Sequence, residues 1–228
     1  MACHGGPDIV EDNLVLCLDA ANTKSYPGSG TTWFDLSGNG HTGTLSNGPT
    51  FSSNNGGIID FDGNDHADFA SSSDFTFGTG DFTISQWLNY DTLQGSSVDM
   101  RGSSWTNTAF SNFIYQSNKW ATWRKSSTYP SAADRWYIST ATLVTGKWYN
   151  FVALRDSGTF KLYINNVLDG TVSFTESLAG GGLVMGVNVS NSNGFGGKMG
   201  PTMIYKGKAL SETEVAQNYN SLKGRFGL

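Results

Sequence analysis

The stretch KWYNFVALRDSGTFKLYINNVLDGTVSF at residues 147–174 constrains the fold more than any other part of the chain. Its pattern is strand, turn, strand, two-residue turn, strand. Large apolar residues alternate with Lys, Tyr and Asn along residues 160–165, which predicts a strand with one inward and one outward face. Asn165 and Asn166 suit a type I′ turn, because asparagine tolerates the positive φ that both central positions need. The segment therefore predicts consecutive antiparallel strands.

The composition favours more strands of this kind. The 29 glycines and the scattered asparagines indicate many turns rather than long helices. Charged residues make up 14% of the chain, against about 25% in an average globular protein, so uncharged polar residues must supply solubility. We expect an all-β, two-sheet antiparallel sandwich in which residues 91–140 are irregular. Its other strands are expected at residues 13–20, 57–61, 66–69, 81–90, 182–189 and 196–205.

One segment, residues 210–222, is typical of a helix. Ser211 is a good N-cap, and Glu214 three residues later completes a capping box. A length of 228 residues suits one large domain. We therefore predict an N-terminal arm at 1–12, a single domain at 13–222 and a C-terminal tail at 223–228.

The cysteines, the first residues and the net charge indicate what environment and which partners to expect. Cys17 lies in an apolar strand, so we expect a buried free thiol, with a bridge to Cys3 as the alternative. The first residues show no basic region and no apolar stretch, so we expect no signal peptide and no membrane insertion. The net charge of −5 argues against a nucleic-acid partner.

Four stretches together resemble a laminin-G-like domain of the concanavalin A-like lectin/glucanase superfamily. They are FDGNDHADF, DFTISQWLN, GKWYNFVALRDSGTFKLYINNVLDG and GGKMGPTMIYKGKALSETEVAQNY, within residues 57–222. This resemblance implies a jelly-roll sandwich. The opening, residues 9–51, resembles more narrowly the start of such domains in virion structural proteins of tailed bacteriophages. The superfamily includes hydrolases, lectins and interaction modules, so the fold alone does not give the function.

The acidic residues do not form a glycosidase pattern. A retaining glycosidase needs two carboxylates about 5–5.5 Å apart. None of the four glutamates lies in a Glu-x-Asp-x-Glu type of run. Asp60 and Asp62 share a strand face, but Asn64 occupies the next position on that face. The three histidines have no metal or triad spacing either, and we expect no enzyme activity.

Residues 61–69, FDGNDHADF, leave two interpretations open. An EF-hand loop needs Gly at its sixth position and Glu at its twelfth, but counting from Asp60 gives Asp65 and Ser71. We favour a plain turn in which Asp62 bonds its own backbone and Gly63 takes a positive φ. The alternative is a structural calcium site, although we expect no cofactor to be required. Its candidate ligands are Asp62, Asn64, Asp65, Asp35 and Asn39.

Residues 101–136 are unusually aromatic and basic. They contain four of the seven tryptophans, and five basic residues against one acidic residue. Trp, Tyr and Arg are enriched at binding interfaces, but tryptophan also fills protein cores. Both interpretations stay open for each residue. The candidate binding residues are Trp105, Trp120, Trp123, Arg124, Tyr129, Arg135 and Trp136.

These observations favour a non-enzymatic bacteriophage structural protein, and we expect a capsid decoration or accessory surface subunit that also binds glycan. Its expected partners are other virion proteins, further copies of itself and a host-surface glycan. We expect it to assemble in the host cytoplasm and to lie on the virion surface. The alternative is a carbohydrate-binding adhesin, such as a tail-fibre or receptor-binding module.

Overall fold

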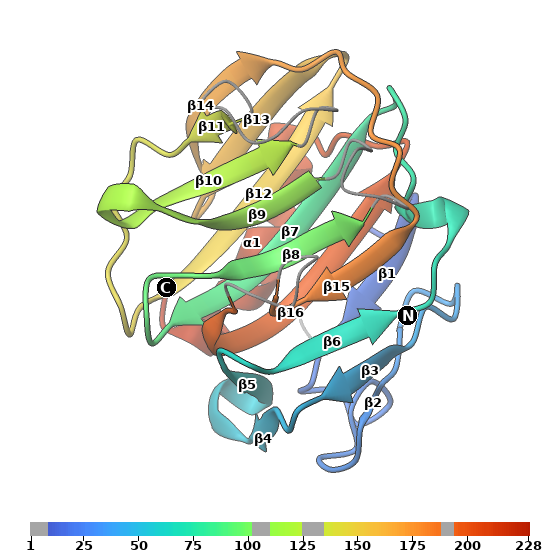
Figure 1. Cartoon of the computed structure of the whole chain (residues 1–228), viewed down its shortest axis with the longest axis vertical. Helices are drawn as coiled ribbons and strands as arrows, with labels where there is room; N and C mark the ends of the chain where they lie inside the picture. The colour runs from blue at the N-terminus through green and yellow to red at the C-terminus, as the bar shows by residue number, and fades with distance from the viewer. Residues whose placement is uncertain (1–8, 102–109, 125–134, 188–193) are drawn as a thin grey trace.

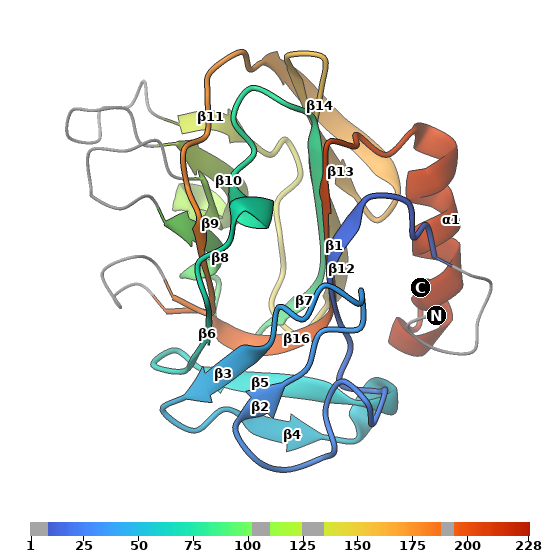
Figure 2. The same ribbon diagram turned by 90° about the vertical axis from the view of Figure 1, so that its right-hand side faces the viewer.

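The computed structural model describes residues 9–101, 110–124, 135–187 and 194–228, which form two antiparallel sheets facing each other (Figures 1 and 2). The all-β sandwich expected from the sequence is therefore confirmed. We call the sheet nearer the viewer in Figure 1 the front sheet and the other the back sheet.

The front sheet has the strand order β11-β10-β9-β8-β15-β6-β3-β2, and all its pairings are antiparallel. Its strands are β2 (Thr32–Trp33), β3 (Gly43–Ser46), β6 (His66–Phe69), β8 (Ser96–Arg101), β9 (Phe110–Tyr115), β10 (Lys119–Arg124), β11 (Arg135–Ile138) and β15 (Gly182–Met185).

The back sheet has the order β14-β13-β12-β7-β16-β5-β4, and β1 also pairs with β16. Its strands are β1 (Leu14–Leu18), β4 (Thr50–Ser52), β5 (Ile58–Asp62), β7 (Phe82–Tyr90), β12 (Trp148–Asp156), β13 (Thr159–Ile164), β14 (Val167–Ser173) and β16 (Gly196–Lys206). Short 3₁₀ turns connect some strands: η1 (Asn54–Gly56), η2 (Ser73–Phe75), η3 (Gln116–Asn118) and η5 (Lys223–Phe226).

The predicted strand meander is β12, β13 and β14. Its two-residue turn has φ of 50° at Asn165 and 63° at Asn166, as a type I′ turn requires. Phe160 and Leu162 point between the sheets, whereas Tyr163 points to the opposite side of the back sheet. The alternation predicted from the sequence is thus confirmed.

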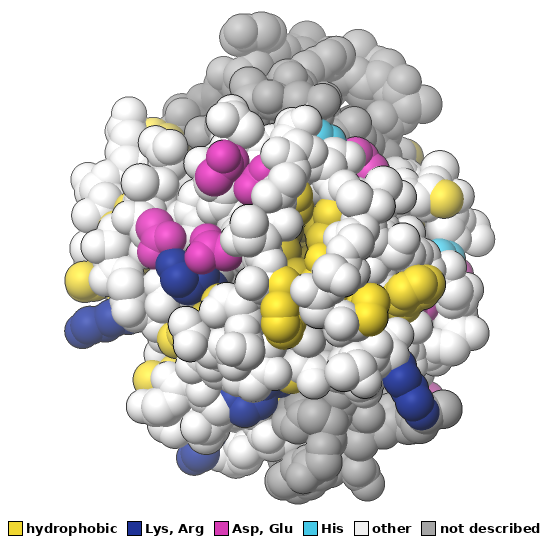
Figure 3. Space-filling model, turned by 90° about the horizontal axis from the view of Figure 1, so that it is seen from below, with side chains coloured by type: hydrophobic (Ala, Val, Ile, Leu, Met, Phe, Trp, Pro, Cys, Tyr) yellow, Lys and Arg dark blue, Asp and Glu magenta, His cyan; other side chains and the backbone are white. Residues whose placement is uncertain are grey.

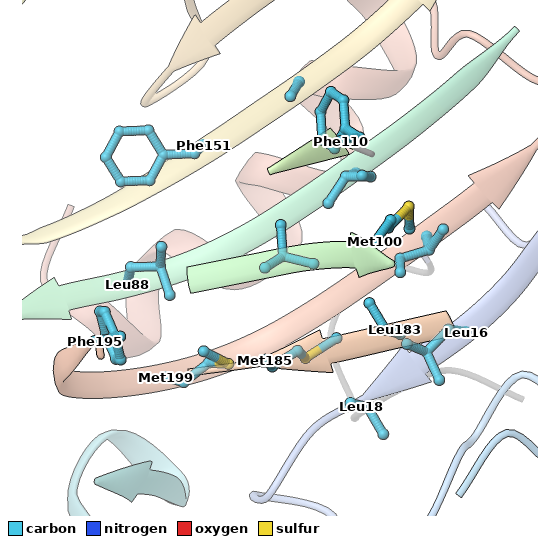
Figure 4. Close-up of a cluster of buried hydrophobic side chains, with 14 of the residues drawn as sticks. Leu16, Leu18, Leu88, Met100, Phe110, Phe151, Leu183, Met185, Phe195 and Met199 are labelled. Carbon is cyan, nitrogen blue, oxygen red and sulfur yellow. The ribbon is translucent and has the colours of Figure 1, made fainter. Parts of the chain in front are cut away.

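The main hydrophobic core lies between the two sheets (Figure 4). Met100, Phe110 and Met185 reach it from the front sheet, and Leu88 and Phe151 reach it from the back sheet. Each of these side chains alternates along its strand with a residue on the other face, because successive side chains in a strand point in opposite directions. Each sheet therefore packs one of its faces against the other sheet.

The described residues form one α-helix, α1 (Glu212–Leu222), which packs on part of the outer face of the back sheet (Figure 2). Ser211 and Glu214 form the predicted capping box. Under the helix lies a second apolar cluster, in which the Tyr219 ring stacks on Trp87 with 5.6 Å between ring centroids. Within the described parts of the chain, no helix is both long enough and apolar enough to cross a bilayer.

Residues 9–12 of the predicted N-terminal arm and the predicted C-terminal tail at 223–228 pack on the domain. Val10 is buried, and its carbonyl accepts a hydrogen bond from the Tyr205 hydroxyl. At the other end, Phe226 is buried and lies 4.4 Å, centroid to centroid, from both Trp87 and Trp148. Residues 9–12 and 223–228 therefore belong to the body of the domain, because their apolar side chains complete the second cluster.

Two predictions need correction. Residues 91–140 are not irregular, because β8, β9, β10 and β11 lie there and form half of the front sheet. Cys17 is disulfide-bonded rather than a free thiol. Cys3 lies outside the described residues. An apolar strand context indicates burial, which is complete for Cys17, but it does not report the redox state of the sulfur.

Candidate functional site

The structure places much of the aromatic and basic segment in the front sheet. Trp123 and Arg124 lie on β10, and Arg135 and Trp136 lie on β11, where the structure describes the backbone. Trp105 and Tyr129 fall outside the described residues. The segment therefore contributes strands to a sheet face, rather than a single irregular loop.

Trp120 does not belong to a binding surface. Its side chain is fully buried and stacks on Phe151 from the back sheet, with 5.4 Å between ring centroids. Its position opposite Ile114 on β9 points it between the sheets, with the other core residues. The core interpretation is thus correct for Trp120, because strand alternation sends every second side chain inward.

Strand pairing aligns one row of residues across the outer face of the front sheet. Each member is paired with the next on the neighbouring strand. The row brings together two carboxylates and two hydroxyls that lie far apart in sequence, and it reaches two residues of the predicted binding segment. We call it the polar row. In order from β3 to β9 it contains Thr44, Asp68, Val184, Asp99 and Ser111, of which Val184, Asp99 and Ser111 are buried. The backbone pairing continues from Ser111 to Trp123 and Arg135.

An aromatic pair lies beside the polar row on the same face. Phe113 and Tyr115 follow Ser111 along β9 at two-residue spacing, so all three share the outer face. Both rings are half-buried, and their centroids lie 6.3 Å apart. Ser96 and Ala121 are paired with Phe113 on its two sides.

The edge of this face near β6 carries a histidine–carboxylate pair. The Nε2 atom of His66 lies 2.9 Å from Oδ2 of Asp68. His66 is largely buried, whereas the Asp68 side chain is 46% exposed, so its carboxylate remains able to accept further hydrogen bonds from solvent or ligand. The sequence analysis missed Asp68 and Asp99 as members of one site. Their common feature, a polar residue at every outward position of a strand, is visible only once the strands are assigned.

The outer faces of the two sheets differ in their covering. α1 lies on the back sheet, and no described helix lies on the front sheet (Figure 2). A sheet face with aromatic rings and several hydrogen-bonding groups is chemically suited to a polar ligand that also has apolar surfaces. The outer face of the front sheet is therefore the candidate site.

The turn at residues 62–65 has the geometry of the plain-turn interpretation. The Asn64 amide donates to Oδ1 of Asp62 at 2.8 Å, and Gly63 has a φ of 97°. The Asp62 amide donates to Oδ2 of Asp65 at 2.9 Å, and the Asn64 carbonyl accepts from the Asn47 amide group at 2.9 Å. The polar groups of the turn thus bond largely to one another and to the neighbouring turn.

Asp35 and Asn39 have a separate role. Oδ1 of Asp35 accepts from the Cys17 amide at 2.9 Å and from the Ser37 amide at 2.8 Å. The Asn39 side-chain amide donates to the Leu14 carbonyl at 3.1 Å. Both residues fasten their loop to β1. Among the described residues, no three His, Cys, Asp or Glu side chains are arranged to hold a metal ion.

Asp60, the other acidic candidate on β5, is paired with a lysine. Its Oδ2 atom lies 3.6 Å from Nζ of Lys198, which also lies 2.7 Å from Oδ2 of Asp91. Burial raises the pKa of Asp60, and the positive charge of Lys198 opposes that change. In the view from below, several acidic side chains lie together beside a basic side chain, and hydrophobic side chains are exposed in the middle of the face (Figure 3).

Solved structures with the same fold include proteins of several activities. Domain 4 of AbnA, an extracellular arabinanase from Geobacillus stearothermophilus solved with arabinotriose, has a TM-score of 0.72 and 19% identity, covering 91% of this chain and 98% of that one. A botulinum neurotoxin type C structure, described as dependent on two ganglioside molecules for cell entry, has a TM-score of 0.67 and 14% identity, covering 93% and 52%. Trypanosoma rangeli sialidase with sialic acid has a TM-score of 0.67 and 14% identity, covering 96% and 34%.

These likenesses show the fold alone, and the chain spans about half of the neurotoxin chain and about a third of the sialidase. The comparison with curated proteins finds no match. The family model described as "Concanavalin A-like lectin/glucanases superfamily" (Laminin_G_3) matches residues 61–216, more than half of the chain. The match runs from β5 through the front-sheet strands to α1, so it includes most of the candidate site. The chain therefore belongs to the concanavalin A-like lectin/glucanase superfamily.

Proposed function

We propose that this protein is a non-enzymatic carbohydrate-binding domain that holds glycan on the outer face of the front sheet. The observation that carries the proposal is the Phe113–Tyr115 aromatic pair on the same sheet face as the exposed Asp68 carboxylate. On the outer face of the back sheet, α1 packs over the second apolar cluster.

The chemistry of this face matches that of a sugar. A pyranose or furanose ring has apolar C–H surfaces that pack on aromatic rings, and hydroxyl groups around its edge. Phe113 and Tyr115 supply the aromatic surface. Asp68, with its exposed carboxylate, accepts hydrogen bonds from hydroxyls, and such a bond to a charged group is stronger than a neutral one.

Two solved structures with the same fold support glycan binding by analogy. The arabinanase domain was solved with arabinotriose, and a neurotoxin structure names gangliosides as its ligands. Analogy of fold does not assign a ligand. The evidence for glycan binding in this protein therefore comes from the residues of the front sheet, and the variants below change these residues.

A glycan array followed by isothermal titration calorimetry tests this proposal. We expect the wild-type protein to bind at least one glycan, and Phe113→Ala or Tyr115→Ala to weaken that binding. Phe34→Ala is the matched control, because Phe34 is also an exposed aromatic residue, at 44% exposure, but follows β2 outside the aromatic pair. If the wild-type protein binds no glycan on the array, the proposed glycan-binding function is wrong.

We also propose that the domain binds glycan without cleaving it and requires no cofactor. Asp60 is held by Lys198, and Asp62 accepts from the backbone of its own turn. Neither arrangement resembles a free nucleophile facing a general acid. Incubation with β-glucan, laminarin, agar and carrageenan should release no new reducing ends. Release that disappears in Asp60→Asn or Asp62→Asn would show that the protein is an enzyme.

A second candidate role is that of a virion surface subunit that assembles with capsid or tail proteins and with further copies of itself. The observation in its favour is the resemblance of residues 9–51 to the start of such domains in phage structural proteins. The disulfide at Cys17 fits either role, because disulfides persist outside the reducing cytoplasm. Cosedimentation of the purified protein with phage particles or empty shells would support this role, and its absence would leave the glycan-binding role alone.

A further inference from the structure

Two buried polar side chains lie side by side between the sheets, on the central strands of the back sheet. Gln86 on β7 is paired with Thr202 on β16. Thr202 is also paired with Leu18, whose side chain points into the main core, so the side chains of Gln86 and Thr202 point there too. Gln86 is 1% exposed and Thr202 is fully buried. Directly paired residues have Cβ atoms about 4.5–5.5 Å apart, so the two side chains are close neighbours.

Each of these side chains has one polar atom with no hydrogen-bond partner among the described residues. Oε1 of Gln86 accepts a hydrogen bond from the Ser97 hydroxyl of the front sheet at 3.0 Å, whereas Nε2 of Gln86 has no partner there. Oγ1 of Thr202 likewise has none. Exchanging the amide nitrogen and oxygen of Gln86 would still leave one of these two atoms unpaired. Because buried polar groups in folded proteins are nearly always hydrogen-bonded, both side chains require a further partner.

The backbone of β16 is interrupted beside Thr202. Its pairing with β7 shifts register between Met199 and Thr202. The two residues in between, Gly200 and Pro201, lie opposite a single residue of β7, which is the arrangement of a β-bulge. On the other side of β16, the described pairing with β5 ends at Met199 and the pairing with β1 begins at Thr202. A bulge leaves backbone groups of the ladder unpaired, so this break adds hydrogen-bonding groups next to the two side chains.

We propose that an internal water molecule occupies this position and bridges the Gln86 amide, the Thr202 hydroxyl and the backbone of the β16 bulge. A buried water typically makes about three hydrogen bonds to groups that would otherwise be unpaired, and these three groups supply that number. All three are uncharged and buried, so a neutral molecule that both donates and accepts suits them better than an ion does. The site lies inside the sandwich and is independent of the proposed glycan binding.

A high-resolution crystal structure of the full chain tests the site directly. We expect electron density for a water within hydrogen-bonding distance of both the Gln86 amide and the Thr202 hydroxyl. A direct hydrogen bond between these two side chains, or a site without water density, would overturn the proposal.

Thr202→Val gives an independent test in solution, because valine is close to threonine in shape but has no hydroxyl. If the hydroxyl binds a water, the variant loses a hydrogen bond, and its melting temperature should fall by about 2–4 °C in a protein of this size. If the hydroxyl has no partner at all, valine removes an unpaired buried polar group, and the melting temperature should not fall. An unchanged or raised melting temperature would therefore contradict the proposal.

Thr122→Val is the matched control for Thr202→Val. Thr122 is also a fully buried threonine, but its hydroxyl donates directly to Oδ1 of Asn112 at 3.1 Å. The melting temperature of this variant should fall, and the size of the fall measures the loss of one buried hydroxyl hydrogen bond in this protein. Circular dichroism shows whether both variants are folded. A fall in Thr202→Val close to that in Thr122→Val is the expected result.

Discussion

Nη1 of Arg225 lies 2.8 Å from Oδ2 of Asp19, a carboxylate at the end of β1 that is fully buried. The other nitrogens of this guanidinium donate to the carbonyls of Asn55 at 3.0 Å and Gly57 at 3.2 Å. The Asn55 side chain donates in return to the Arg225 carbonyl at 2.7 Å. The C-terminal segment is thus fastened to two distant parts of the chain, beside the aromatic cluster that Phe226 completes.

Arg225→Ala should destabilise the fold by about 3–5 kcal/mol, because it leaves the buried Asp19 carboxylate without its counter-charge. The free energy of unfolding from urea titration measures this effect. Lys161→Ala is the control, since Lys161 pairs at the surface with Asp156, whose side chain is 44% exposed. Exposed pairs contribute about 0–1 kcal/mol. Equal losses in the two variants would contradict the role assigned to the Arg225–Asp19 pair.

Trp120→Ala should cost about 3–5 kcal/mol of folding stability, as expected for removal of a buried tryptophan. Phe113→Ala, on the neighbouring strand but on the outer face, should cost less stability and lose glycan binding instead. Urea unfolding followed by circular dichroism gives the first quantity, and calorimetry with a bound glycan gives the second. A Trp120→Ala protein as stable as the wild type would show that the side chain is not part of the core.

Asp65→Asn should stabilise the protein above neutral pH. Burial raises the pKa of Asp65, and the nearby Asp62 carboxylate raises it further, while the hydrogen bond from the Asp62 amide opposes them. Because the pKa of Asp65 is higher in the folded state than in the unfolded state, protonated Asp65 stabilises the fold below the unfolded pKa of about 3.9. This stabilisation is lost as the pH rises through the pKa of the folded state. Asparagine keeps the acceptor oxygen but cannot ionise.

The measurement for Asp65 is the melting temperature of wild type and variant between pH 3 and pH 8. The difference in favour of Asp65→Asn should grow as the pH rises and should vanish at the acidic end. Asp91→Asn, which alters a carboxylate that is 53% exposed, provides the control and should show no such trend. A difference in melting temperature that grows toward acidic pH would contradict the predicted effect of the raised Asp65 pKa.

The turn at residues 62–65 should be indifferent to calcium. A ligand that binds the native state raises the melting temperature by mass action, so excess calcium should leave the wild-type melting temperature unchanged, and so should EDTA. Asp62→Ala should respond in the same way. A rise with calcium that disappears in Asp62→Ala would establish the alternative, a structural metal site formed by Asp62, Asn64 or Asp65.

The sequence by itself determined the features that depend on near neighbours. The alternation at residues 160–165, the positive φ of Asn165 and Asn166 and the capping box of Ser211 and Glu214 all involve residues a few positions apart. Their physical causes are strand periodicity, turn sterics and the unpaired amides of a helix start, which act within one turn or one strand. Such features can be predicted from local sequence.

The strands between residues 91 and 140 were missed because neither face gives a continuous apolar signal. β9 carries Asn112 inward, where it accepts a hydrogen bond from the Thr122 hydroxyl at 3.1 Å. Phe113 and Tyr115 on the outward side reverse the usual pattern of apolar in and polar out. Because polar residues point inward and aromatic residues point outward, hydropathy does not alternate along these strands in the way that predicts a strand. The segment was therefore predicted to be irregular.

Only the tertiary structure decided which residues form the site and which form the core. The segment 101–136 supplied Trp120 to the core, whereas Asp68 and Asp99, from other parts of the sequence, joined the outer face. Likewise, nothing local distinguishes Arg225 from any other basic residue near a chain end. These outcomes depend on which strands pair and on what lies opposite them. Such long-range contacts are set by the packing of the whole sandwich, which local sequence does not encode.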